Sequence, residues 1–193
     1  LTVGLAEGHA WGGGQMMAAT GKLCSPNIPT EEVFTMPHRE KVNGVLSSTK
    51  PLSLRGSVVD GIRMVFKDGV ATEFSATQGE SVLKGLLETD EGARRLGELA
   101  LVPNSSRVSR SNLLYFNTLF DENAACHIAM GRAIGSNMQD LGSLTEEQRT
   151  ARGMNYSLIH VDWMIGSGQV DVDGIRQDGG RDVLMRAGEW VDL

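Results

Sequence analysis

The stretch YSLIHVDWMIGSGQVDVDGI, residues 156–175, places a histidine and an aspartate two positions apart inside an apolar run, at His160 and Asp162. Side chains alternate along a strand, so residues two apart leave the same face. A carboxylate is almost never buried without a partner, because removing its water costs several kcal/mol. Something on that face must therefore satisfy Asp162 and His160 together. An Asp–His hydrogen bond or an Asp–Arg pair at a sheet edge would do so, and so would a cation.

Three further stretches place carboxylates or imidazoles close to apolar runs. They carry Glu31 and Glu32 in IPTEEVF, Glu98 in LGELALVP, and Asp121, Glu122 and His127 in LFDENAACHIAMG. Carboxylates with added imidazoles suit a divalent ion of the zinc, cobalt or manganese sort, and carboxylates can bridge a metal pair. Such sites activate a water and polarise a carbonyl, the usual chemistry of aminopeptidases. The plainer alternatives are a solvent-facing Glu98 at a sheet edge and an ordinary helical histidine at His127.

The elements that would position these groups are mostly short strands. Residues 58–76 alternate in hydrophobicity around the turn Lys67-Asp68-Gly69 and predict a β-hairpin. Residues 79–98 begin with apolar side chains at helical spacing and predict a helix. The next segment, LALVP at 99–103, is typical of a short buried strand.

The second half of the chain predicts one more helix and a final pair of strands. Residues 117–134 favour a loop that runs into a helix, with Asp121 near the helix start, where anions are favoured. Residues 168–175 and 181–190 are expected to be strands on either side of a QDGG turn. Together with the irregular, proline-containing segment SPNIPTEEVFTMPH, these elements predict an α+β fold rich in antiparallel strands.

Bulk composition limits the function classes. The chain has 193 residues, is 40% hydrophobic and 22% charged, and so suits one sizeable globular domain, 1–193. A net charge of -6 without basic clusters argues against nucleic acid as a partner. The absence of a long apolar run argues against a membrane span, and the two cysteines, too few for a disulfide scaffold, favour the cytoplasm. Because LTVGLAEGHAW lacks an initiator Met and begins within an expected strand, we expect a fragment of a longer protein.

Five motifs in one order identify a resemblance. The segments NIPTEEVFTMPH, STKPL, LGELALVP, TLFDENAACHIAMG and HVDWMIGS together resemble the thermophilic aminopeptidase family of the aminopeptidase T, aminopeptidase S and PepS type. The resemblance covers nearly the whole chain. Family members are about twice as long, so the resemblance implies that 1–193 is a C-terminal, metal-binding catalytic domain that follows an α/β N-terminal domain.

The resemblance also implies a site and an activity. Carried over by motif, the family's metal ligands are Glu32, Glu98, His127, His160 and Asp162, and Glu32 and Glu98 are expected to take part in catalysis. The family binds two divalent ions per chain, for which zinc, cobalt, manganese and magnesium are the candidates. It removes N-terminal residues from short peptides, which implies short peptide substrates, an interface with the chain's own N-terminal domain, and a homodimer. Either Glu31 or Glu122 would take the proton from the attacking water.

One position departs from the family pattern. Family members have a tyrosine near the metals, seven positions after the DENA histidine, where this chain has the substrate-binding candidate Ile134. Isoleucine cannot donate a hydrogen bond to a developing oxyanion. Tyr156 is the tyrosine close in sequence to a ligand that could replace the missing phenol.

Two other functions remain open from the sequence. Ring-cleaving dihydroxypyridine dioxygenases look distantly like this family and hold one non-haem iron with two histidines and an aspartate, a pattern that His127, His160 and Asp162 alone would fit. The added Glu32 and Glu98 favour a dinuclear site instead. A catalytically impaired, metal-binding module is the second alternative, because the family tyrosine is missing at Ile134.

Overall fold

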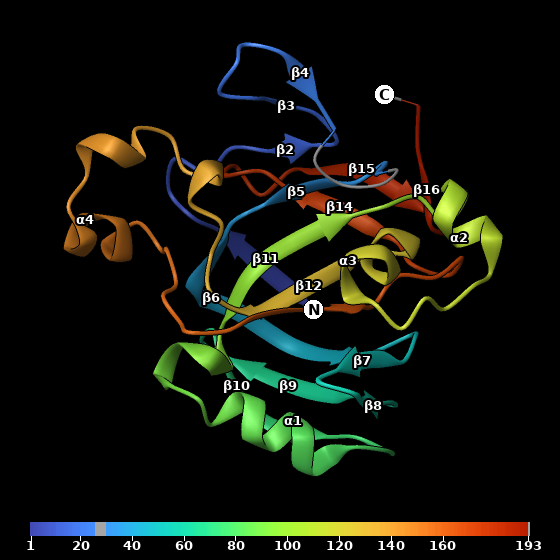
Figure 1. Cartoon of the computed structure of the whole chain (residues 1–193). Coiled ribbons are helices and arrows are strands. Elements are labelled where there is room, and N and C mark those ends of the chain that lie inside the picture. Colours follow the sequence, from blue (N-terminus) through green and yellow to red (C-terminus); the bar gives the residue numbers. More distant parts are fainter. Residues whose placement is uncertain (26–29, 193) are drawn as a thin grey trace.

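The computed structural model describes residues 1–25 and 30–192 and is built mainly of strands (Figure 1). The strands are β1 (Thr2–Leu5), β2 (Gly12–Gly13), β3 (Met16–Met17), β4 (Leu23–Cys24), β5 (Val33–Thr35), β6 (Pro37–Ser47), β7 (Leu52–Leu54), β8 (Ser57–Val59), β9 (Arg63–Lys67), β10 (Val70–Ser75), β11 (Leu96–Leu101), β12 (His127–Gly131), β13 (His160–Met164), β14 (Val172–Ile175), β15 (Arg181–Arg186) and β16 (Glu189–Trp190). The helices are α1 (Glu80–Leu87), α2 (Arg107–Ser111), α3 (Thr118–Asp121) and α4 (Glu146–Ala151), with 3-10 turns at Glu91–Arg94, Glu122–Ala124, Gly135–Asn137 and Leu141–Ser143. All strand pairs of the described part are antiparallel, which confirms the expected α+β class.

A five-stranded sheet with the order β13-β12-β11-β5-β2 forms the centre of the molecule. Its strands come from distant parts of the sequence, and β12 lies between β11 and β13. One face of this sheet carries Ile128, Met130 and Trp163, all almost fully buried. That apolar face packs into the main hydrophobic core. The opposite face is the one that receives the polar groups.

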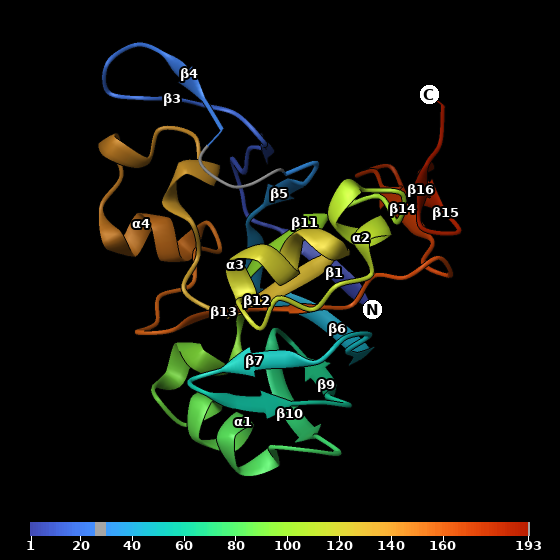
Figure 2. The same ribbon diagram turned by 45° about the vertical axis from the view of Figure 1, so that its right-hand side comes forward.

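The second sheet has the order β1-β6-β9-β10 and shares the main core with the central sheet. Met64 and Phe66 of β9 point into this core, and α1 covers it with Leu83 and Leu87. The hairpin β7–β8 and helix α1 lie beside β9 and β10 at the bottom of both views (Figures 1 and 2). The β9–β10 pair confirms the hairpin predicted around Lys67-Asp68-Gly69.

The remaining elements extend from these two sheets. The three-stranded sheet β14-β15-β16 contains the predicted final pair of strands on either side of the QDGG turn, and β16 adds a short third strand. The hairpin β3–β4 projects away from the body of the molecule in both views (Figures 1 and 2). Residues 26–29 lie outside the described residues. They belong to the segment SPNIPTEEVFTMPH, which was expected to be irregular, and the second half of this segment forms β5 and the beginning of β6. Within the described ranges, the helices are too short or too polar to cross a membrane.

The prediction of a helix ending near 134 is wrong. Helix α3 stops at Asp121, a 3-10 turn follows, and Ala125 is fully extended, so the chain enters strand β12 at His127. The alanines and methionine of this stretch are good helix formers. Here pairing with β11 on one side and β13 on the other overrides that local preference.

The helix predicted over 79–98 is also shorter than expected. Helix α1 ends at Leu87, and the Asp90 carboxylate then accepts the Ala93 N–H to cap the 3-10 turn that follows. Strand β11 therefore begins at Leu96, earlier than the LALVP segment, and Glu98 lies within it. Since β11 is the third of five strands, the alternative of a solvent-facing Glu98 at a sheet edge is wrong.

Candidate metal centre

Strand register brings the polar groups to one face of the central sheet. Ala129 of β12 pairs with Glu98 on β11 and with Asp162 on β13. Directly paired residues point to the same face, so the two carboxylates stand on either side of a small methyl group. His127 precedes Ala129 by two positions and His160 precedes Asp162 by two, so both imidazoles leave this face too.

Glu32 joins the cluster from the residue just before β5, the neighbour of β11. It lies two positions before Phe34, which pairs with Ala100, and Ala100 in turn pairs with His127. The same alternation therefore directs Glu32 toward the His127 side of the cluster. Its neighbour Glu31, one of the two candidates to take the proton, points elsewhere: its carboxylate accepts the Arg107 N–H at 3.1 Å.

The five side chains that the sequence singled out converge. His127 Nε2 lies 3.5 Å from Glu32 Oε2 and 3.9 Å from Glu98 Oε1. His160 Nε2 lies 3.4 Å from Glu98 Oε2 and 3.6 Å from Asp162 Oδ1. Glu98 thus stands between the two imidazoles, with Glu32 at one end and Asp162 at the other. Candidate ligand atoms of Glu98, His160 and Asp162 all lie within 4.8 Å of one another.

Without a cation, burial of these carboxylates would cost desolvation free energy. Glu32, Glu98, His127 and Asp162 are each less than 10% exposed, whereas the His160 side chain is 30% exposed. The cluster is therefore closed on the His127 side and open beside His160. Glu32 Oε2 is buried and lacks a hydrogen-bond partner. Three buried carboxylates near two imidazoles need positive charge to offset their desolvation.

Both imidazoles are oriented for metal binding. His127 Nδ1 lies 3.0 Å from the Ala125 carbonyl oxygen, and His160 Nδ1 lies 2.7 Å from the Arg132 carbonyl oxygen. A carbonyl only accepts, so each Nδ1 carries a proton, and Nε2 is the ring nitrogen left to bind an ion. Backbone carbonyls fix metal-binding histidines in this way in many proteins.

Gly131 allows His160 to reach its position. It pairs with His160 at the end of β12 and has a φ of 102°. A side chain at Gly131 would strike the carbonyl oxygen of Ile159, the residue just before His160. The close approach of the two backbones here therefore requires glycine.

The pKa values of Glu32, Asp162 and His160 are shifted by burial and by the neighbouring charges. Burial raises the pKa of Glu32 and of Asp162, and the charge of Glu98 raises both further. Burial by itself would lower the pKa of His160, but contact with Glu98 and the charge of Asp162 outweigh it and raise this pKa to about 9. In the metal-free protein the cluster therefore holds a proton on His160 near neutral pH.

The residues fit a divalent ion. Two ligand atoms at about 2.1 Å from a tetrahedral ion lie about 3.4 Å apart. The observed imidazole–carboxylate separations span 3.4 to 3.9 Å, so small movements would bring them to such an ion. Carboxylates with imidazoles, rather than thiolates, suit zinc, cobalt or manganese.

Glu122 is a buried sixth group in contact with the cluster. Its side chain is hydrogen-bonded to Asp162, and this bond acts to lower the Asp162 pKa against the effect of burial. It follows Asp121, whose buried carboxylate accepts the N–H groups of Tyr115 and Asn117 at 2.7 and 2.9 Å. The 3-10 turn at Glu122–Ala124 brings Glu122 to β13, a position that the DENA motif marked without revealing the contact with Asp162.

The two candidates for contact with substrate, Ile134 and Tyr156, have different surroundings. Ile134 is half-buried just before a 3-10 turn, two residues after Arg132. Tyr156 packs against a separate apolar cluster that contains Met36 and Met154. Its hydroxyl is buried without a hydrogen-bond partner, so it does not replace a phenol at the cluster.

Comparison with known proteins agrees with this chemistry. The sequence profile of the family described as "Thermophilic metalloprotease (M29)" matches residues 1–190. The chain is 54% identical over 191 residues to "Aminopeptidase 2" of Geobacillus stearothermophilus and 56% identical to "Aminopeptidase T" of Thermus aquaticus. Each match covers 99% of this chain and 46% of the relative. The solved structure "Wild-type AmpT from Thermus thermophilus" superposes with a TM-score of 0.92 at 54% identity, over 98% of this chain and 47% of that one. The chain thus spans about half the length of the curated relatives it matches.

Proposed function

The chain belongs to the M29 family of thermophilic metalloproteases, and from this we propose that it carries the metal centre of an aminopeptidase that removes N-terminal residues from short peptides. The observation that carries the proposal is the convergence of Glu32, Glu98 and Asp162 on the Nε2 atoms of two histidines, one buried and one partly exposed. Names of relatives alone would leave the site undefined. The cluster supports the proposal with geometry from this chain.

We propose that the five side chains hold two divalent ions, with Glu98 between them. Glu98 contacts both imidazoles through different oxygens, at 3.9 and 3.4 Å, which suits a bridging carboxylate. Glu32 and His127 would then hold one ion, and Asp162 and His160 the other. Zinc, cobalt, manganese and magnesium are the candidates. When bound, such ions lower the pKa of a water and polarise the scissile carbonyl.

The protein's own groups supply orientation, charge and proton transfer. The carbonyls of Ala125 and Arg132 accept the Nδ1 protons and so turn each Nε2 toward the carboxylates. The open side beside His160 gives a peptide its approach, whereas the His127 side is closed. Glu122, in contact with Asp162, is the carboxylate best placed to take a proton, because Glu31 is bonded to Arg107.

The mononuclear iron alternative accounts for the cluster less well. His127, His160 and Asp162 could form a two-histidine, one-carboxylate triad. Such a triad leaves Glu32 and Glu98 without a role, although both are buried and lie against the imidazoles. Two ions use all five groups.

The wider context is proposed on the same basis. Because the relatives are about twice as long, we propose that the active protein includes an N-terminal domain. A homodimer is proposed from the family resemblance alone. Cys24 and Cys126 are both free thiols, which suits a reducing compartment, and we assign the protein to the cytoplasm.

The proposal is tested by metal analysis together with peptide hydrolysis. The whole chain replaces the matching part of Thermus aquaticus aminopeptidase T, so that the chimera has the length of a complete relative. After loading with cobalt or zinc, the chimera should contain two ions per chain and hydrolyse leucine p-nitroanilide. One iron per chain, with cleavage of a dihydroxypyridine ring, would instead favour the dioxygenase. Two ions without hydrolysis would leave a metal-binding module.

A further inference from the structure

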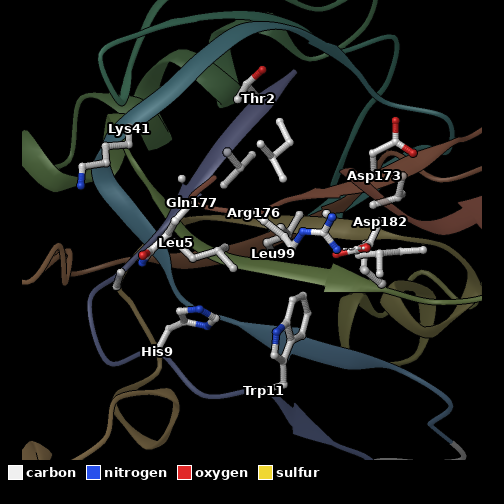
Figure 3. A pocket seen from close by; sticks show the side chains of 18 of the residues that line it. Thr2, Leu5, His9, Trp11, Lys41, Leu99, Asp173, Arg176, Gln177 and Asp182 are labelled. Carbon is white, nitrogen blue, oxygen red and sulfur yellow. Dashed lines mark hydrogen bonds and ion pairs between the residues drawn. The ribbon is translucent and has the colours of Figure 1, made fainter. Parts of the chain in front are cut away.

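A large groove lies on the side of the central sheet opposite to the metal centre. Leu99 and Leu101 line it, and they alternate along β11 with Glu98 and Ala100, so they leave the other face. The groove has a volume of about 1060 Å³ and is bounded by β1 and β14 (Figure 3). It is therefore separate from the metal centre, although the same strand contributes to both.

Both borders of the groove are unpaired strand edges. Strand β1 is the outer strand of its four-stranded sheet, and β14 is the outer strand of the three-stranded sheet. In the described part of the chain, the backbone of Thr2–Leu5 pairs with β6 and that of Val172–Ile175 pairs with β15, each on one side only. Natural proteins usually cover such edges, because their free N–H and C=O groups invite another strand.

The groove is lined for an extended polypeptide. Leu5, Leu99 and Leu184 supply apolar contacts, and Trp11 and Ile175 at its sides remain 44% and 58% exposed. Its volume lies just above the range of about 300–1,000 Å³ that small-molecule sites occupy. A ligand that uses both strand edges must itself carry backbone donors and acceptors, which a peptide segment does.

We propose that a strand from the other half of a full-length family member enters this groove and pairs with β1, β14 or both. Addition of a strand gains main-chain hydrogen bonds from the edges, and alternate apolar side chains of that strand pack on Leu99 and Leu101. The argument for this occupant is length: the matched relatives contain more than half of their residues outside the region they share with this chain. A segment of that other half is covalently available, and its tethering raises its effective concentration.

Amide hydrogen exchange tests this proposal in two forms of the protein. In the 193-residue chain alone, the outward-facing amides of β1 and β14 should exchange rapidly, because nothing covers them. In the chimera with Thermus aquaticus aminopeptidase T, the same amides should exchange at about one tenth of that rate or more slowly still. Equal rates in both proteins would overturn the proposal. Slow exchange in the chain alone would overturn it as well, since the groove would then be closed without the other half.

A matched pair of substitutions locates the contact. Ile175→Asp places a charge in the groove, whereas Val183→Asp places one on the neighbouring strand β15, at a position that is 37% exposed and does not line the groove. In the chimera, Ile175→Asp should restore rapid exchange at β1 and β14, and Val183→Asp should not. If both or neither did so, the proposed strand would not lie in the groove.

A second copy of the chain is the competing occupant. It would make the mass of the isolated chain depend on concentration, and Ile175→Asp would abolish that dependence. This result would replace the proposed occupant with a dimer contact. None of these measurements depends on metal or on peptide hydrolysis, so failure of the proposed function would leave this test unaffected.

Discussion

Glu98 and Asp162 face each other across Ala129, which pairs with both of them in the central sheet. The free space between the two carboxylates therefore depends on the size of an uncharged residue. Ala129 is completely buried, and its methyl group leaves room above the sheet where a larger side chain would lie among the acids.

Substitution of Ala129 by leucine should therefore remove metal without changing a single candidate ligand. A larger side chain here should also lower the free energy of unfolding by about 1–3 kcal/mol through overpacking. Metal content by mass spectrometry should fall, and hydrolysis by the chimera should fall with it. Ala129→Gly is the control, because it leaves the space open and should keep the metal. Full metal content in Ala129→Leu would show that the acids do not need this space.

Glu98→Gln should reduce metal content and turnover together. Glu98 contacts both imidazoles, so the neutral amide removes the group proposed to lie between two ions. Glu31→Gln is a matched control. Glu31 is next to Glu32 in the sequence, but its side chain is exposed and accepts a hydrogen bond from the Arg107 N–H. Glu31→Gln should keep both ions and full activity. Retention of two ions by Glu98→Gln would exclude a bridging role.

Glu122→Gln separates a proton acceptor from a ligand. General acid–base groups commonly contribute about 10²–10⁴-fold in rate. If Glu122 takes the proton from the attacking water, kcat should fall by about this range, while metal content stays unchanged. Loss of an ion in the same variant would contradict the assignment as base and place Glu122 among the ligands. Metal analysis beside kcat therefore decides between the two roles.

Metal affinity should rise with pH through the neutral range. In the metal-free protein the pKa of His160 is raised to about 9, so a proton occupies this imidazole near pH 7 and must leave when a metal binds. Apparent zinc affinity should therefore increase as pH rises and level off above about 9. The raised pKa values of Glu32 and Asp162 act in the same direction at acid pH, because protonated carboxyl groups bind metal poorly. Calorimetry in buffers of different ionisation enthalpy measures the released proton, and His160→Gln should release fewer.

The raised pKa of His160 gives the stability of the metal-free protein the opposite pH dependence: this stability should fall as pH rises. A histidine whose folded-state pKa is raised above its ordinary value of 6.5 stabilises the fold fully below pH 6.5. That contribution is lost as pH rises through about 9. The metal-free protein should accordingly have a lower melting temperature at pH 9.5 than at pH 6, and His160→Gln should flatten the difference. An unchanged pH dependence in His160→Gln would show that other groups cause it.

Local sequence patterns predict part of the candidate site, whereas the full set of five ligands follows from the family resemblance. Alternation predicts that His160 and Asp162 share a face, and the structure agrees. The strand at His127 could not be predicted, because its helix-forming residues become a strand only through pairing with β11 and β13. The contact of Glu122 with Asp162 depends on a 3-10 turn, which has no strong local signature. The groove between β1 and β14 joins strands from opposite ends of the chain, which no local pattern records.

Ile134→Tyr tests whether the missing phenol limits the rate. Ile134 lies two residues after Arg132, whose carbonyl holds the imidazole of His160, and so lies in the segment next to the open side of the cluster. A tyrosine hydroxyl that reaches a substrate there could donate a hydrogen bond to the developing oxyanion, and such donors contribute about 10²–10³-fold in rate. We therefore expect a higher kcat in the chimera with unchanged metal content. Ile134→Phe is the control, because it adds the ring without the donor and should leave kcat as it is. An equal kcat in Ile134→Tyr and Ile134→Phe would mean that residue 134 does not face the substrate, and the departure from the family pattern would then have no catalytic consequence.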